Sequence, residues 1–275
     1  MKKKFLFIPL FALFLSAFLL TGCDGQQGEQ NRYETYVNAA RYAMGNAEVS
    51  INVTYLDVDW VGGQVNLEYT DDAFFSYTES VDRNTETMDF DLAKNEDLNM
   101  RWMIDRATLR IKYAKSGAKL IDKIRKTLTI KVPKRTDLSS LSVKTVSARI
   151  ESELDAWRAN FETVSGRINC MGTFTNNLNF ETVSGDVKYS TQTLKYATQT
   201  LPSEIEADTV SGNVVFNFPL TASFTVAFES VSGNLHTDSA FQGTHNGNYF
   251  KVNGGSTKIE ANTVSGDCTL ISLPD

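Results

Sequence analysis

Apolar and polar residues alternate with a period of two through most of the chain, around a short motif that keeps returning. The motif is (Glu/Asp/Asn)-(Thr/Ser)-Val-Ser-Gly, and apolar residues recur mostly five and three positions before its valine and four and six after it. The alternation predicts half-buried strands on both sides of the motif. The change of phase at Ser-Gly predicts a corner between them, and we expect a positive φ at its glycine. The central valines are Val164, Val183, Val210, Val231 and Val264.

Two degenerate copies, centred on Val146 and Val61, keep the same offsets. Repeats of about 20–50 residues are typical of stacked arrays, in which each copy buries its apolar face against its neighbours. The sequence therefore predicts an all-β fold, a single-chain β-solenoid over residues 46–275 with its corners at the Thr-Val-Ser-Gly repeats. The unequal spacing of the valines predicts insertions around 191–202 and 242–253.

The chain begins with a segment that has the features of a secretory signal. Lys2, Lys3 and Lys4 precede an apolar run, which ends in Leu-Thr-Gly-Cys23. This ending resembles the lipobox of bacterial lipoproteins, in which the cysteine becomes the lipidated first residue. An uncleaved anchor is the alternative, although about 16 apolar residues are short for a span. We predict a lipoprotein signal peptide over 1–22, lipidation of Cys23, a polar tether over 23–31 and a location on the extracytoplasmic face of the cell membrane.

A short helix is predicted for residues 32–45. Apolar residues recur there at helical spacing, from Tyr33 to Met44, and Gly45 follows as a stop signal. Because the exposed edges of a β-stack must be covered, we expect this helix to cap one open end of the solenoid.

The overall charge is acidic. Removal of the three leader lysines takes the formal net charge from −6 to −9, which argues against nucleic acid as a partner. Cys170 and Cys268 both occupy apolar positions of distant repeats, so we expect two buried, unbridged thiols.

One segment has the opposite charge. From Arg101 to Arg135 the chain carries twelve basic residues and two acidic ones. A solvated strand face is the simpler interpretation. The alternative is a patch that binds anionic polymer or lipid headgroups. For that patch we expect Arg110 and Lys112 on one face, with Lys131 on a neighbouring strand.

Surface rows also recur with the motif. Acids two positions before the valine are expected to be screened by water and salt, with bridging by a cation such as calcium as the alternative. The motif serines fit a hydrogen-bonded corner ladder better than a set of nucleophiles, because neither histidine recurs with them. We predict no catalytic residue, no metal site and no cofactor. A further row, three positions after the valine, contains Gln64, Arg149, Arg167, Asp186, Asn213, Asn234 and Asp267.

The repeated (Glu/Asp)-Thr-Val-Ser-Gly-(Asp/Asn) motif follows a strand that reads Lys-Thr-Leu-Thr-Ile-Lys-Val-Pro133. This combination resembles the bacterial "putative adhesin" β-strand-repeat family, and the likeness covers about residues 49–273. The resemblance implies a β-solenoid and a role in adhesion or envelope stress. It supplies no catalytic residues.

Three functions remain open at this point. The first is a non-enzymatic, lipid-anchored, adhesin-like surface protein that binds an envelope polymer or a partner protein. The second is an envelope-stress sensing lipoprotein, and the third is a polysaccharide-cleaving β-solenoid enzyme. Such an enzyme needs two carboxyl groups in one groove, whereas the acids here recur singly with the repeat. We therefore predict a binding protein.

Overall fold

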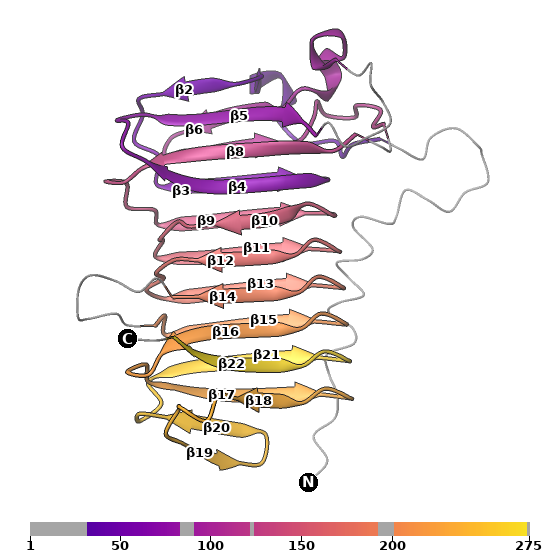
Figure 1. The fold of residues 1–275 in the computed structure, drawn as a ribbon. Coiled ribbons are helices and arrows are strands. Elements are labelled where there is room, and N and C mark those ends of the chain that lie inside the picture. The colour runs from indigo at the N-terminus through magenta and orange to yellow at the C-terminus, as the bar shows by residue number, and fades with distance from the viewer. Residues whose placement is uncertain (1–31, 83–90, 122–123, 192–200, 274–275) are drawn as a thin grey trace, which may run out of the picture.

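A computed structural model describes residues 32–82, 91–121, 124–191 and 201–273. Two long sheets run side by side along the molecule and enclose one continuous apolar core (Figure 1). The twelve-stranded sheet has the order β1 (Ala43–Met44), β6 (Arg101–Asp105), β7 (Thr108–Lys112), β3 (Tyr55–Trp60), β9 (Ser140–Thr145), β11 (Arg158–Thr163), β13 (Asn177–Thr182), β15 (Glu204–Thr209), β21 (Thr257–Thr263), β17 (Phe224–Ser230), β20 (Tyr249–Val252) and β19 (Gly243–Asn246). The ten-stranded sheet has the order β18 (Leu235–Thr237), β22 (Cys268–Leu273), β16 (Val214–Pro219), β14 (Val187–Ser190), β12 (Ile168–Met171), β10 (Arg149–Ser152), β4 (Gly63–Thr70), β8 (Lys126–Pro133), β5 (Phe75–Val81) and β2 (Ala47–Val49).

Each coil of the solenoid places one strand in each sheet, and neighbouring coils pair in parallel and in register. Phe161 lies opposite Phe180, for example, and their rings stack with centroids 5.6 Å apart. Buried residues alternate with less buried ones along strands such as β13 and β15, so the side chains of the two sheets meet in the core. Full burial of such a phenylalanine contributes roughly 1.5–3 kcal/mol. The predicted all-β solenoid is confirmed.

The motif forms the corner between the two strands of a coil, and its residues have separate tasks. The threonine hydroxyl accepts a hydrogen bond from the glycine N–H three residues on, at 2.8 Å from Gly185 to Thr182. The carbonyl oxygen of the motif valine accepts hydrogen bonds from the serine of the next coil. Ser184, for example, donates both its N–H and its hydroxyl to the carbonyl oxygen of Val164. The expected serine ladder is thus present along the corner.

The glycines of the five full copies have no positive φ, so that part of the prediction is wrong for them, and it holds only for Gly63 of the degenerate copy at Val61, with φ +100°. The five glycines are required by close approach instead. A Cβ on Gly185 would lie 1.8 Å from the carbonyl oxygen of Gly166 in the next coil. A Cβ on Gly212 would likewise lie 1.9 Å from the carbonyl oxygen of Gly185, and a Cβ on Gly266 would lie 1.9 Å from that of Gly212. The column of glycines therefore sets how tightly the coils stack at the corner.

The order of the coils differs from the order of the sequence at both ends. The strands β7 and β8 form a coil that stacks outside the coil of β3 and β4. At the other end, β21 and β22 insert between the coil of β15 and β16 and the coil of β17 and β18. The predicted insertion at 242–253 contains the antiparallel hairpin β19–β20, which covers β17.

The predicted helix over 32–45 is wrong. This segment holds only a short 3₁₀ turn, Ala39–Arg41, and the strand β1. Its backbone N–H groups bond to a distant loop, because Tyr33 N donates to Ala118 O and Tyr36 N to Ser116 Oγ. These tertiary bonds replace the bonds of a helix.

Two further 3₁₀ turns, Leu92–Lys94 and Glu96–Leu98, lie before β6. No helix among the described residues has the length and apolar character needed to cross a membrane. The predicted signal peptide, Cys23 and the tether lie outside the described residues, as does most of the predicted insertion at 191–202.

Candidate functional site

The basic segment does not form one surface. Arg110 and Lys112 share the outer face of β7, but Lys131 lies on β8 in the other sheet, so its expected position on a neighbouring strand is wrong. The chain crosses from one sheet to the other between these strands, and strand alternation alone cannot reveal that crossing.

Acidic neighbours surround the two β7 cations. Arg110 lies 3.6 Å from Asp57 and 3.8 Å from Asp105. Lys112 pairs with Asp59 and with Glu34, and its side chain is only 14% exposed. Burial lowers the pKa of Lys112, but the two carboxylates outweigh that effect and raise it overall. Both charges are therefore matched within the fold.

A third basic residue, Lys126, lies inside the protein. Its Nζ donates to Glu79 Oε2 at 2.6 Å and to the carbonyls of Leu98 and Tyr113 at 2.6 and 2.5 Å. It also lies 4.8 Å from the ring centre of Trp60. Burial lowers the pKa of Lys126 to about 8, although Glu79 opposes the shift. This ion pair ties β5 and β8 to the chain before β6, and it has a structural role.

The acidic row forms a ladder on the twelve-stranded sheet. Glu162, Glu181 and Asp208 lie opposite one another on adjacent strands. Lys144 pairs with Glu162 at 2.9 Å, and Asn262 donates to Asp208 at 2.8 Å. Burial, followed by neighbouring acids, raises the pKa of Glu181 and of Asp208. Among the described residues, no group of three or more His, Cys, Asp or Glu side chains could hold a metal ion.

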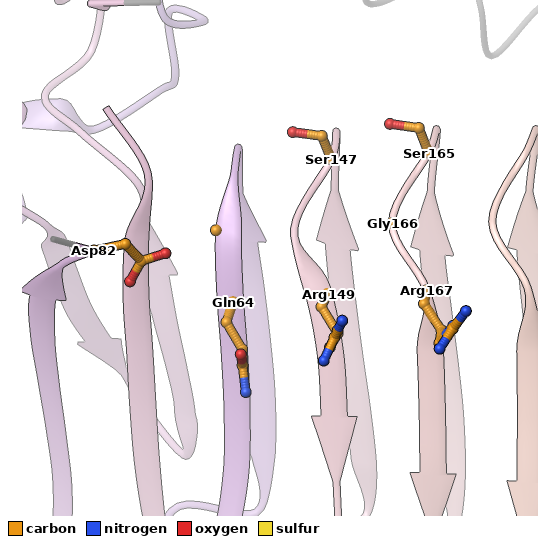
Figure 2. A pocket seen from close by; sticks show the side chains of 8 residues that line it. Gln64, Asp82, Ser147, Arg149, Ser165, Gly166 and Arg167 are labelled. Atoms are coloured by element: carbon orange, nitrogen blue, oxygen red, sulfur yellow. The ribbon is translucent and has the colours of Figure 1, made fainter. Parts of the chain in front are cut away.

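A groove of about 410 Å³ lies beside three successive corners, where β3 joins β4, β9 joins β10 and β11 joins β12. In Figure 2, Gln64, Arg149 and Arg167 stand in a row on adjacent strands, with the motif serines at the tips of the corners and Asp82 at the far end of the row. The lining consists of Gly63, Gln64, Asp82, Ser147, Arg149, Ser165, Gly166 and Arg167. All of these residues are small or polar, so the groove suits a hydrated ligand.

The two arginines face the groove from neighbouring coils, with Arg149 as the first residue of β10 and Arg167 directly before the parallel strand β12. The Arg149 side chain is 55% exposed, and its Nε lies 3.9 Å from Glu151 Oε1, which is beyond hydrogen-bonding distance. The Arg167 side chain is 59% exposed, and its Nη2 lies 3.3 Å from Asp186 Oδ2. Exposed pairs of this kind are weak, about 0–1 kcal/mol. The guanidinium groups can therefore turn to an outside acceptor.

Sequence reasoning placed both arginines in a surface row but did not identify them as a site. The available signal was that two consecutive copies carry arginine at a position where later copies carry Asp or Asn. The residues that the sequence did propose, Arg110, Lys112 and Lys131, lie away from the groove lining.

The family profile of Toastrack DUF4097 matches residues 47–202 and 193–271 of the chain. No protein of curated function matches it.

Several solved structures show similarity to this chain. One, described as a "putative cell adhesion protein" from Clostridium sporogenes, is 10% identical with a TM-score of 0.37, covering 84% of this chain and 100% of that one. A "putative adhesin" from Bacteroides fragilis is 16% identical with a TM-score of 0.40, covering 83% and 97%. A third, a "putative adhesin" from Parabacteroides distasonis, is 11% identical with a TM-score of 0.27, covering 83% and 97%.

Proposed function

The chain belongs to the Toastrack DUF4097 family, and we propose that it is a non-catalytic, lipid-anchored binding protein on the extracytoplasmic face of the cell membrane. The groove beside the corners is its binding surface. The observation that carries the proposal is the pair of exposed arginines, Arg149 and Arg167, in a polar groove on an acidic protein.

The sequence of the leader supports the location. Residues 1–22 have the basic start and apolar run of a secretory signal, and Cys23 closes a lipobox-like ending. A tether over 23–31 spans at most roughly 30 Å when extended. The solenoid is then held close to the membrane, within reach of envelope polymers.

The composition of the groove favours binding over polysaccharide cleavage. Asp82 is the one carboxylate among its lining residues, and it accepts a hydrogen bond from Thr127 Oγ1 at 2.6 Å. Glycoside hydrolysis normally needs two carboxyl groups about 5–10 Å apart across the scissile bond. The carboxylates of the acidic ladder are close together, but they lie on the other sheet.

Two measurements test this function. Cell fractionation with a fatty-acid label should place the wild-type chain in the membrane, and Cys23→Ala should abolish labelling and membrane retention. Residues 24–275, which contain every described strand, should be retained by isolated envelope polymer without shortening it on size-exclusion chromatography. Progressive shortening of the polymer would establish an enzyme, and the absence of both membrane association and retention would reject the proposal.

A further inference from the structure

The row of residues three positions after the motif valine has two different structures along the stack. In the later coils it is an Asx ladder, in which each side chain accepts a backbone N–H of the next coil. Asn213 N donates to Asp186 Oδ1 at 3.1 Å, Asp267 N to Asn213 Oδ1 at 3.0 Å, and Asn234 N to Asp267 Oδ1 at 2.7 Å. The ladder therefore stabilises the stacking of these coils.

Arginine cannot continue this ladder, because a guanidinium only donates. Arg149 and Arg167 nevertheless occupy the row in adjacent coils, each directly before the paired residues Ile150 and Ile168, where like charges repel each other. Arg167 Nη2 donates to Asp186 Oδ2 of the neighbouring coil at 3.3 Å, but so exposed a contact contributes little to stability. The 3.9 Å separation of Arg149 Nε from Glu151 Oε1 is too long for a hydrogen bond. A local rule that is broken for so small a gain points to function. We propose that Arg149 and Arg167 form a binding subsite for the oxyanions of an elongated, anionic envelope polymer, with phosphodiester or carboxylate groups along its length. The inference deepens the function proposed above and rests on it.

The side chains match this ligand class. A guanidinium presents parallel N–H groups that bind a carboxylate or a phosphate in a bidentate manner. Hydroxyl groups of Ser147 and Ser165 line the same groove, and their bonds to carbonyls of the neighbouring coil are long, at 3.4 and 3.5 Å. Either hydroxyl can rotate to donate to an anion.

The direction of the groove indicates an elongated ligand. Its residues come from three successive coils, and parallel strands are about 4.8 Å apart, so the row runs along the stack. A third guanidinium lies near these corners, since Arg125 Nη1 is 3.8 Å from the position of a Cβ on Gly62. Asp82 lies at the opposite end of the row, where it accepts a hydrogen bond from Thr127 Oγ1. A polymer that carries an anion on each repeat unit can therefore meet adjacent arginines while following the stack.

Binding of defined polymers to residues 24–275 tests the inference. The probes are poly(glycerol phosphate) for phosphodiesters, polygalacturonate for carboxylates and dextran as a neutral chain. We expect wild-type protein to bind at least one polyanion and not dextran, more weakly at 200 mM salt than at 50 mM. Arg149→Gln together with Arg167→Gln should weaken that binding at least tenfold. Arg149→Lys with Arg167→Lys should weaken it less, because charge remains while the bidentate geometry is lost.

The matched control removes the same amount of charge elsewhere. Arg110→Gln together with Lys131→Gln should leave binding within about twofold of wild type, and circular dichroism should show that both double variants are folded. Equal binding by the Arg149/Arg167 variant and wild type would overturn the subsite. Equal loss in the control would indicate a general charge effect and overturn it too.

Two other outcomes separate this inference from the proposed function. Retention of residues 24–275 by isolated envelope polymer, without affinity for either defined polyanion, would reject the oxyanion subsite while the binding function stands. Binding to anionic phospholipid vesicles and to neither polyanion would move the ligand to the membrane surface and also reject the subsite.

Discussion

The glycine column at the corners gives the sharpest prediction about stability. A Cβ on Gly185 would lie 1.8 Å from the carbonyl oxygen of Gly166 and 2.9 Å from Thr182 Oγ1. The Thr182 oxygen is also the acceptor that holds the turn, since it accepts the N–H of Gly185 at 2.8 Å. Gly185→Ala must therefore separate two coils locally or break the turn. Flexible side chains cannot relieve the clash, because its closest partner is backbone.

The magnitude follows from opposing effects. Overpacking of this kind typically costs about 1–3 kcal/mol, and the disturbed hydrogen bond costs about 1 kcal/mol more. Replacing glycine by alanine restricts the unfolded chain and returns about 0.4–1 kcal/mol. We expect a net loss of about 2 kcal/mol, which lowers the Tm by roughly 4–8 °C for a domain of this size.

Gly62→Ala is the matched control. Its Cβ would lie 3.1 Å from Ser147 Oγ, a side-chain atom that can move, so we expect stability within about 1 kcal/mol of wild type. Urea unfolding of residues 24–275, followed by circular dichroism, compares both variants with the wild type. The account of the corner is refuted if Gly185→Ala proves as stable as Gly62→Ala.

Three further predictions concern the ends and faces of the solenoid. Lys126→Met should cost about 3–5 kcal/mol in chemical denaturation because it leaves Glu79 buried without its partner, and adding Glu79→Leu should recover much of the loss. The raised pKa of Asp208 means that the folded state binds its proton more readily than the unfolded state, so this carboxyl adds stability as the pH falls from 7 toward 4. Asp208→Asn should therefore stabilise the protein at pH 7 and have a smaller effect at pH 4, and an equal effect at both would contradict this. Truncation after Asn253 removes β21 and β22, against which β17 and β18 pair, so limited proteolysis should then cleave the coil of β17 and β18. Cleavage confined to the N-terminal coils would argue against the insertion of β21 and β22 beside that coil.

Much of the corner could be predicted from the sequence, because strand alternation and its phase change are local signals. The reason for the glycines could not, since the contact between Gly185 and Gly166 depends on the distance between coils. The helix over 32–45 failed for a related reason. Its spacing was helical, but the N–H groups of Tyr33 and Tyr36 find partners far along the chain.

The candidate site was harder to predict than the fold. Alternation in β7 and β8 showed which side chains point outward, but it did not show that the two strands lie in different sheets. Arg110 also has acidic neighbours that are distant in sequence or across a hairpin. For Arg149 and Arg167, adjacency followed from the repeat register, yet the groove around them emerges only when three corners are stacked.

Amide hydrogen exchange with and without poly(glycerol phosphate), or with polygalacturonate if that is the polyanion bound, tests the central claim most directly. If the corner groove binds the polymer, protection should increase around residues 62–64, 147–149 and 165–167 and stay unchanged on β7. Protection confined to β7 or to the acidic ladder of the twelve-stranded sheet, or no change anywhere in the chain, would contradict the assignment of the groove as the binding surface.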